Sequence, residues 1–376
     1  MATACLSLFL FAVSAALLPA ALLRAADDLG VSAEVMSWAV ATQFIACFIA
    51  IIAGGVLSDR LGMKPVLLGA SAMLSLGALL WTQAESLPAV HLAAALMGMG
   101  GGVLESLGSA LLAALYPERR ALVLNLSQAV YCGGAVAGPA LMAILLPLGV
   151  SWRSFFAAEA ILGLILLGLY RATPMPPPAS ASGDGGVMPC LHRLRQGSVL
   201  ILAVALFCYV LVESGVAFFL NLHLQQRLGA PERWAVLGIS AFWAAMLIGR
   251  LICAALPDRL FSARVLGLMA LAGAASLAAQ SLIDDWLPAL ALFALSGLLI
   301  SGLWPGIVAL TARTHPRHIG STMGGVIAVG SLGVAAAPMV ASLVASLGGG
   351  IHFFLVLAAA LLAVAPLLRA VPPPSP

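Results

Sequence analysis

The sequence predicts an all-α membrane protein with twelve transmembrane helices in two pseudo-symmetric six-helix bundles. Three observations lead to this fold class. Hydrophobic residues make up 62% of the 376 residues and charged residues only 8%, whereas a soluble domain carries about 25% charged residues. Twelve long apolar segments follow one another along the chain. Finally, a pattern of charged, glycine and proline residues in the first half returns 199 residues later.

The composition also limits the partners and the chemistry. A mean hydropathy of +1.12 makes lipid the main solvent of the surface. The net charge of +3, without a basic run, gives no reason to expect nucleic acid. The six cysteines are scattered and form no Cys-x-x-Cys pair, so we expect neither a metal site nor a disulfide framework, and no cofactor. The first apolar segment lacks a basic start and a cleavage site, which indicates a retained helix.

Each apolar segment is long enough to cross about 30 Å of hydrocarbon, which takes roughly 20 residues. The segments cover residues 4–24, 34–56, 65–83, 89–115, 121–147, 153–171, 198–222, 233–255, 263–282, 287–311, 320–346 and 350–370. Between the sixth and the seventh, residues 173–197 are rich in Pro, Gly and Ser, which is typical of a flexible linker. We therefore expect an N-terminal bundle over 1–172, a cytoplasmic linker over 173–197 and a C-terminal bundle over 198–376.

The repeat fixes the order of the two halves. Asp59-Arg60-Leu61 returns as Asp258-Arg259-Leu260, and the same shift relates Pro117 to Pro316, Pro139 to Pro338, Gly134 to Gly333 and Phe155 to Phe354. One shift that matches elements over about half the chain predicts two halves in parallel order, each with the same series of helices.

Basic residues predict the orientation in the membrane. Thirteen of the 17 Lys and Arg residues, Arg250 and Arg259 among them, fall on the side that holds both termini. Because cytoplasmic loops carry the excess of Lys and Arg, both termini and the linker are expected in the cytoplasm. The expected location is a bacterial inner (plasma) membrane.

The loop between the second and third segments reads Gly-Val-Leu-Ser-Asp-Arg-Leu-Gly-Met-Lys over residues 55–64. It resembles the signature loop of the major facilitator superfamily, whose members are transporters that rock two six-helix halves around a central site. The resemblance implies a secondary active transporter that works by alternating access. Its gating residues are Gly55, Asp59, Arg60, Gly62 and Lys64, with Asp258 and Arg259 in the weaker second copy.

The gating loop also has a physical rationale. Asp59 can face the positive end of a neighbouring helix, and Arg60 and Lys64 can pair with acids or with helix carbonyls. Such contacts hold one closed state and break in the other. A plain topology anchor is the alternative.

Two carboxylates fall near the middle of apolar segments, Glu105 in the fourth and Glu213 in the seventh. A charged residue at a helix centre costs about 2.5–3.5 kcal/mol on insertion scales, so such a residue usually serves a function. We interpret both as proton-coupling groups; a structural acid bonded between helices is the alternative. Glu159 falls near the outer end of the sixth segment and is expected at the membrane interface.

Spacing predicts a polar face that binds the substrate. Tyr209 and Glu213 lie one turn apart, and the 199-residue shift sets Trp304 opposite Glu105. Carboxylates and amides can bond hydroxyl groups while an aromatic ring stacks on a sugar, although Trp304 can equally be a packing residue. The predicted substrate-binding residues are Glu105, Asn125, Gln128, Tyr209, Glu213 and Trp304.

Two short patterns point to different branches of the superfamily. Leu104-Glu105 in the fourth segment and Asn125-Leu-Ser-Gln128 in the fifth are similar to the fucose-permease-like branch, which imports sugars with protons. That branch has an acid in its first helix, and here the first segment has none between residues 4 and 24. Residues 134–139, Gly-Ala-Val-Ala-Gly-Pro, resemble part of the signature of proton-coupled drug exporters instead.

These patterns predict proton-coupled uptake of a small polar solute such as a sugar; the alternative is a proton-coupled exporter of drugs or metabolites. The expected partners are the solute, protons and the lipid bilayer, and the protein is expected to be a monomer. The chain has neither His-Glu-x-x-His nor Gly-x-Ser-x-Gly, so we expect no enzyme. It also has no phosphate-binding loop, so ATP is not expected to drive it directly.

Overall fold

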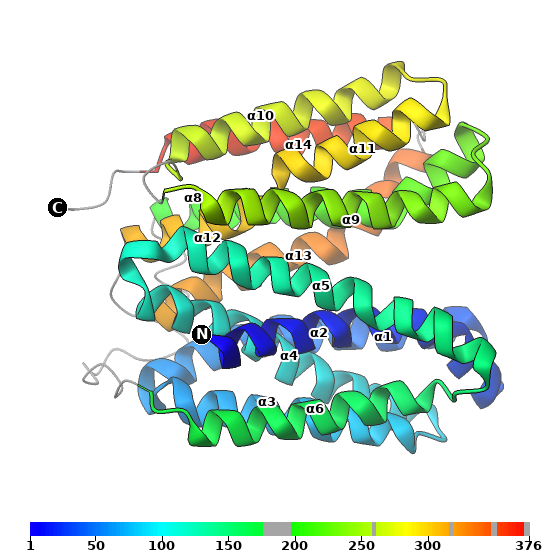
Figure 1. Cartoon of the computed structure of the whole chain (residues 1–376), viewed down its shortest axis with the longest axis vertical. Coiled ribbons are helices and arrows are strands. Elements are labelled where there is room, and N and C mark those ends of the chain that lie inside the picture. The colour runs from blue at the N-terminus through cyan, green and yellow to red at the C-terminus, as the bar shows by residue number, and fades with distance from the viewer. Residues whose placement is uncertain (176–196, 258–260, 316–318, 347–351, 372–376) are drawn as a thin grey trace. The chain divides into compact units, whose positions relative to one another are not determined.

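The computed structural model describes residues 1–175, 197–257, 261–315, 319–346 and 352–371. Within these ranges it is helical and contains no strand, which confirms the all-α prediction (Figure 1). The long helices are α1 (Ala2–Leu29), α2 (Ala33–Leu61), α3 (Met63–Thr82), α4 (Leu87–Leu115), α5 (Arg120–Leu145), α6 (Arg153–Ala172), α8 (Gly197–Leu222), α9 (Glu232–Ala255), α10 (Ala263–Ala279), α11 (Trp286–Ile300), α12 (Leu303–Thr314), α13 (Ile319–Ser346) and α14 (His352–Arg369).

Local sequence explains where several helices begin and end. The Ser32 hydroxyl accepts the amide of Val35 at the start of α2, and Ser262 and Asp285 cap α10 and α11 in the same way. Gly30 ends α1 in the left-handed region, with φ of 65°. Gly62 joins α2 to α3 with φ of 85°, a backbone conformation that strongly favours glycine.

Eleven of the described segments are long and apolar enough to cross a membrane. They match the first eleven predicted segments, with α11 and α12 together forming the tenth, Trp286–Thr314. The expected twelfth crossing corresponds to α14, whose apolar stretch Phe353–Arg369 is shorter than the others. Among the described residues, length and composition therefore support eleven crossings, one fewer than predicted.

The tenth crossing is not continuous, contrary to the expected single helix over 287–311. Ser301 and Gly302 form a turn that separates α11 from α12. Pro305 supplies the reason, because a proline in a helix lacks the amide hydrogen and its ring clashes with the carbonyl four residues earlier, here that of Ser301. The helical pattern resumes when Gly306 N donates to Gly302 O at 2.9 Å.

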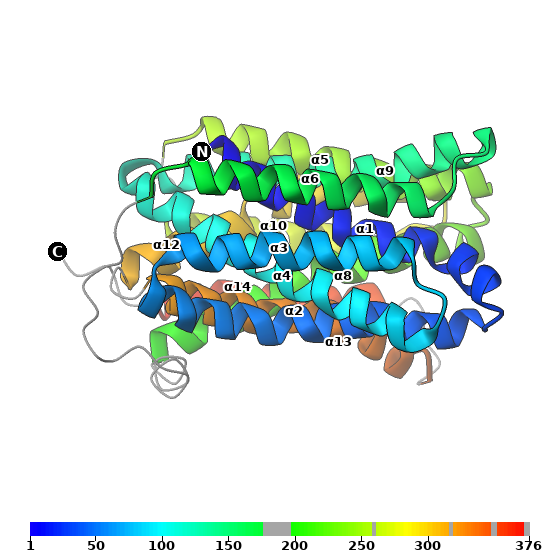
Figure 2. The ribbon, with the colours of Figure 1, turned by 90° about the horizontal axis from the view of Figure 1, so that it is seen from below.

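The described chain forms two compact units. Unit 1 holds α1–α4, α6, residues 130–145 of α5 and the first turns of α13. Within it, α4 packs against α1, α2 and α3, and α3 also packs along α6 (Figure 2). The contact between α2 and α4 is close because Gly98 has no side chain: a Cβ there would lie 2.0 Å from the Gln43 carbonyl oxygen.

Unit 2 holds residues 116–129 at the beginning of α5, together with α8–α12, the rest of α13, and α14. Within it, α10 packs against α14 and α11, α9 packs against α11 and α8, and α8 packs against α14 and α12 (Figure 1). The domain limits at residues 172 and 198 stay predictions.

Candidate functional site

The clearest polar cluster of unit 2 is a buried ion pair between Arg250 of α9 and Glu213 of α8. Arg250 Nη2 lies 3.0 Å from Glu213 Oε1. Tyr209 Oη donates to the same carboxylate oxygen at 2.8 Å and lies 3.5 Å from Arg250 Nη2. Arg250 Nη1 donates to the backbone carbonyl of Gln128 at 2.9 Å. Three helices thus meet at one charged centre.

Helical spacing builds this centre. Tyr209 and Glu213 are four residues apart on α8, and Met246 and Arg250 are four apart on α9, so each pair shares one face of its helix. The two faces meet, since Tyr209 Oη also contacts Met246 Sδ at 4.0 Å. Because α8 and α9 are adjacent helices, a short connection brings the acid and the base together.

Burial makes this pair energetically important. The side chain of Arg250 is 1% exposed and that of Glu213 is 13% exposed. A buried ion of this kind carries a desolvation penalty of several kcal/mol, which only a well-placed partner offsets. Glu213 is therefore the charged group of the cluster with some access to solvent, and each charge depends on the other.

Of the other predicted binding residues in unit 2, Gln128 bonds to this cluster, whereas no bond to it is described for Asn125 or Trp304. Gln128 contributes its backbone carbonyl rather than its amide, and its Nε2 is buried without a hydrogen-bond partner. Asn125, one turn earlier on α5, donates Nδ2 to its own helix at Ala121 O, 2.8 Å away. Trp304 is buried on α12, a helix that packs against α8.

Glu105 belongs to unit 1. It is 9% exposed on α4, and Cys47 of α2 lies within its electrostatic reach. The glycines on either side let α1 approach: a Cβ at Gly101 would lie 2.7 Å from Phe11, and one at Gly108 would lie 3.0 Å from Leu8. The face predicted to be polar is thus partly a packing surface against α1.

The gating loop shows one clear set of contacts. Lys64 Nζ donates to the carbonyls of Arg171 and Thr173 at 2.9 Å each, so it binds the end of α6 within unit 1. Cations are favoured at a helix C-terminus, where carbonyls lack intrahelical partners. Gly55 and Gly62 are buried, and Arg60 is exposed. Asp258 and Arg259 lie outside the described residues, so their predicted gating role stays a prediction.

Arg250 is the functional candidate that the sequence analysis does not single out. The orientation count includes it among the arginines of the cytoplasmic side, and the structure buries its side chain inside α9. Its position was a usable signal, because it falls five residues before the end of the predicted segment 233–255. An arginine within an apolar segment calls for a partner.

Two titratable groups outside the spanning segments, His223 and Asp28, have shifted pKa values. His223 follows α8 in a short π-helix, His223–Arg227, and packs against Phe293 and Phe354. Burial, with a smaller effect of Arg227, lowers the pKa of His223 to about 4, so this imidazole is neutral near neutral pH. The indole of Trp152 and the guanidinium of Arg153 both donate to Asp28 and lower its pKa, so this exposed carboxylate stays ionised.

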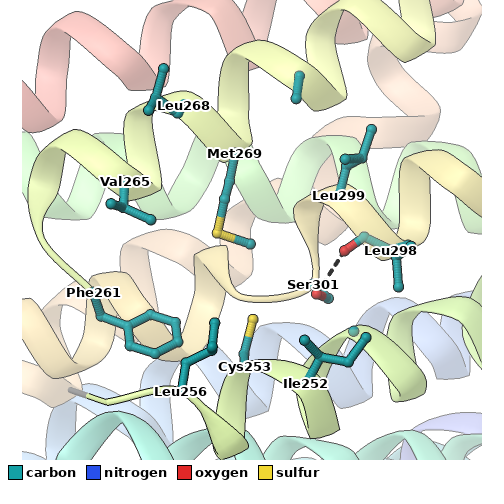
Figure 3. A pocket seen from close by; sticks show the side chains of 12 residues that line it. Ile252, Cys253, Leu256, Phe261, Val265, Leu268, Met269, Leu298, Leu299 and Ser301 are labelled. Atoms are coloured by element: carbon teal, nitrogen blue, oxygen red, sulfur yellow. Dashed lines mark hydrogen bonds between the residues drawn. The ribbon is translucent and has the colours of Figure 1, made fainter. Parts of the chain in front are cut away.

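An apolar cavity of about 470 Å³ lies on another face of α9, between α9, α10 and the end of α11 (Figure 3). Its lining is mostly aliphatic, with Ser301 and Cys253 as its polar or polarisable members. Ile252 and Leu268 are both more than half exposed on the surface of the chain. The cavity holds no charged side chain, so we distinguish it from the Arg250 cluster.

Comparison with known sequences gives the family. A family model described as Major Facilitator Superfamily matches residues 3–286. The 3-(3-hydroxy-phenyl)propionate transporter of Escherichia coli is 27% identical over 323 residues, covering 84% of this chain and 79% of that protein. The multidrug resistance protein MdtL of E. coli is 29% identical over 164 residues, covering 43% of this chain and 42% of that protein.

Solved structures agree in fold. The E. coli fucose:proton symporter FucP has a TM-score of 0.83 at 19% identity and covers 99% of this chain and 98% of its own. The human organic anion transporter MFSD10 has a TM-score of 0.80 at 20% identity, with 98% of each chain covered. At such identities the likeness shows the fold alone. The sequence match, the apolar helices and the fold together place this chain in the Major Facilitator Superfamily, as an integral multi-pass membrane transporter and not an enzyme.

Proposed function

We propose that this transporter couples proton movement to the uptake of a small polar solute, and that Glu213 is a proton-coupling group. The observation that carries the proposal is the buried ion pair of Glu213 and Arg250, 3.0 Å apart. Protonation of Glu213 removes the negative charge that offsets Arg250. Because an unpaired buried charge is costly, the arginine then needs a second anion.

Within the class of polar solutes, the buried arginine favours a small organic anion over a sugar. A guanidinium can bind a carboxylate through two parallel hydrogen bonds. A solute carboxylate on Arg250 would take the place of Glu213, and the released Glu213 would accept a proton. The relative named as a 3-(3-hydroxy-phenyl)propionate transporter supports this choice.

A sugar remains the second candidate. Tyr209 and Glu213 lie within one cluster with the backbone carbonyl of Gln128, and carboxylate, hydroxyl and carbonyl groups are suited to binding sugar hydroxyls. The fold of the fucose:proton symporter supports this candidate. The match to a multidrug resistance protein supports the exporter, whose substrate would move against the proton flow.

The charge moved per cycle separates the first two candidates. One monocarboxylate entering with one proton carries no net charge, whereas one sugar entering with one proton carries a positive charge. We expect proteoliposomes to take up labelled 3-(3-hydroxy-phenyl)propionate under an inward proton gradient and to respond weakly to an imposed membrane potential. Fucose, xylose and a cationic drug such as ethidium complete the panel, and liposomes without protein correct for passive entry of the acid.

Replacing Glu213 with Gln tests the coupling residue. Glu213→Gln mimics the protonated acid, so we expect it to lose proton-driven accumulation by at least tenfold while solute exchange between equal pools continues. Glu85→Gln, an exposed acid in the loop before α4, is the matched control. Accumulation that survives in Glu213→Gln would exclude Glu213 as a coupling group.

We also propose that the protein is a monomer in a bacterial inner membrane. The excess of Lys and Arg on one side supports a cytoplasmic location for both termini. Green fluorescent protein fused after residue 376 should be fluorescent, and alkaline phosphatase fused there should be inactive. The opposite pair of results would reverse the orientation.

A further inference from the structure

Glu159 is a buried carboxyl group that the proposed coupling at Glu213 does not use. The sequence placed it at the membrane interface, but the structure buries it to 1% exposure on α6, inside unit 1. It lies six residues into the helix from Arg153, which corresponds to about 9 Å along the axis. The interfacial assignment was therefore wrong, because the acid faces the neighbouring helices rather than water.

Two buried polar residues from two other helices accompany this acid. Ser14 of α1 is 0% exposed and its hydroxyl interacts with the Glu159 carboxyl group. Gln43 of α2 is 2% exposed, and its Nε2 donates to the carbonyl and the hydroxyl of Ser14 at 3.3 Å each. Because a carbonyl can only accept, the Ser14 carbonyl fixes the orientation of the Gln43 amide.

A count of donors and acceptors shows what this cluster lacks. Gln43 Oε1 and both carboxyl oxygens of Glu159 are buried without a well-formed hydrogen bond. All three atoms are acceptors when the acid is ionised, and the Ser14 hydroxyl beside them has one hydrogen to donate, so the cluster has more acceptors than donors. A proton on Glu159 supplies one donor and removes a charge that no cation pairs with in the described part of the chain.

The charged groups on the neighbouring helices are occupied elsewhere or lie at the helix ends. In the described part of the chain, α3 and α1 both pack against α6. Helix α3 contributes Lys64, which binds the last carbonyls of α6. Helix α1 contributes Arg24, Asp27 and Asp28 at its outer end and Cys5 at its beginning, and Asp28 pairs with Arg153. On α3, Trp81 stacks on Phe156, which lies three residues before Glu159 on α6, with ring centroids 5.1 Å apart.

We propose that Glu159 is a second proton-binding site, located in unit 1, which holds a proton in this conformation and exchanges it during transport. The claim that Glu159 exchanges its proton during transport rests on the proposed proton coupling. The claim that Glu159 holds a proton in this conformation does not depend on it. Binding forms an O–H bond on one carboxyl oxygen, and release returns that proton to water when α1, α2 and α6 rearrange. Ser14 and Gln43 are positioning residues for this carboxyl group.

Infrared spectroscopy of the purified protein tests the bound proton without a substrate. A protonated carboxyl group has its own C=O stretching band, which shifts in D₂O. We expect Glu159→Gln to reduce this band at neutral pH, while Glu85→Gln, at an exposed position, leaves it unchanged. Ser14→Ala keeps the acid but removes its hydroxyl neighbour, so the band should move in frequency. If the band keeps its intensity in Glu159→Gln, the proposal is overturned. If Glu159→Gln does not fold, Ser14→Ala decides instead, and an unchanged band frequency in that variant overturns the proposal.

A transport measurement tests the exchange. With 3-(3-hydroxy-phenyl)propionate or fucose, whichever the wild type moves, we expect Glu159→Gln to carry fewer protons per solute than the wild type. An unchanged ratio would make Glu159 a structural acid and would overturn the exchange. If the wild type moved neither probe, the proposed substrate classes would fail, while the infrared result would still decide whether Glu159 holds a proton.

Discussion

Arg250→Ala should destabilise the protein by about 3–5 kcal/mol, because it leaves the buried Glu213 carboxylate without its counter-ion. The reverse change, Glu213→Ala, should cost at least as much, since it leaves the guanidinium of Arg250, which is 1% exposed and keeps its charge, without the carboxylate. The measurement is the free energy of unfolding in detergent, or the order of thermal unfolding midpoints where unfolding is irreversible.

The paired variant Arg250→Met with Glu213→Leu is the informative control. Replacing a buried ion pair by apolar groups of similar volume is often neutral or stabilising. We therefore expect the double variant to recover most of the stability lost in Arg250→Ala and to lose coupled transport. If the double variant is as unstable as the sum of the two single variants, the charges do not depend on each other and the coupling argument loses its basis.

Gly98→Ala should have the second large effect, in unit 1. The new Cβ would lie 2.0 Å from the Gln43 carbonyl oxygen and 2.8 Å from the carbonyl carbon. These are backbone atoms of α2, so no side-chain rotation relieves the clash and α2 and α4 must separate. Overpacking of this kind typically costs about 1–3 kcal/mol, and the shift of Gln43 should also disturb its bonds to Ser14.

Gly69→Ala on α3 is the matched control, because a Cβ at that position meets no atom within 4 Å. Alanine is favoured over glycine within a helix by about 0.5–1 kcal/mol, so this change should raise the thermal unfolding midpoint. A Gly98→Ala protein as stable as Gly69→Ala would contradict the close contact between α2 and α4.

The sequence predicted the family and most of the helices because both depend on local signals. Apolar length marks a spanning helix wherever it occurs, and the loop over residues 55–64 carries its motif in ten consecutive positions. The break at Ser301 was also readable in principle, since Pro305 stands inside the predicted segment 287–311. Because that segment is apolar throughout, hydropathy alone predicts one continuous helix and gives no sign of the break.

The sequence does not predict the partners of the charged residues, because these partners are distant along the chain. Glu213 looked like an isolated acid because its counter-ion lies 37 residues away on the next helix. Arg250 was interpreted by its distance from a loop, and Glu159 by its distance from a helix end. Burial depends on which face of a helix meets its neighbours, and that information comes only with the packed structure.

The turn at Ser301 has a consequence for the chemistry of the neighbouring helix. Gly249 precedes Arg250 and meets this turn so closely that a Cβ there would lie 2.3 Å from Ser301 Oγ and 2.9 Å from the Leu298 carbonyl. Gly249 thus allows α9 to pack closely against the end of α11, at the turn that Pro305 causes. Because Arg250 directly follows Gly249 in α9, this contact couples the position of Arg250 to the turn that Pro305 causes in a different helix.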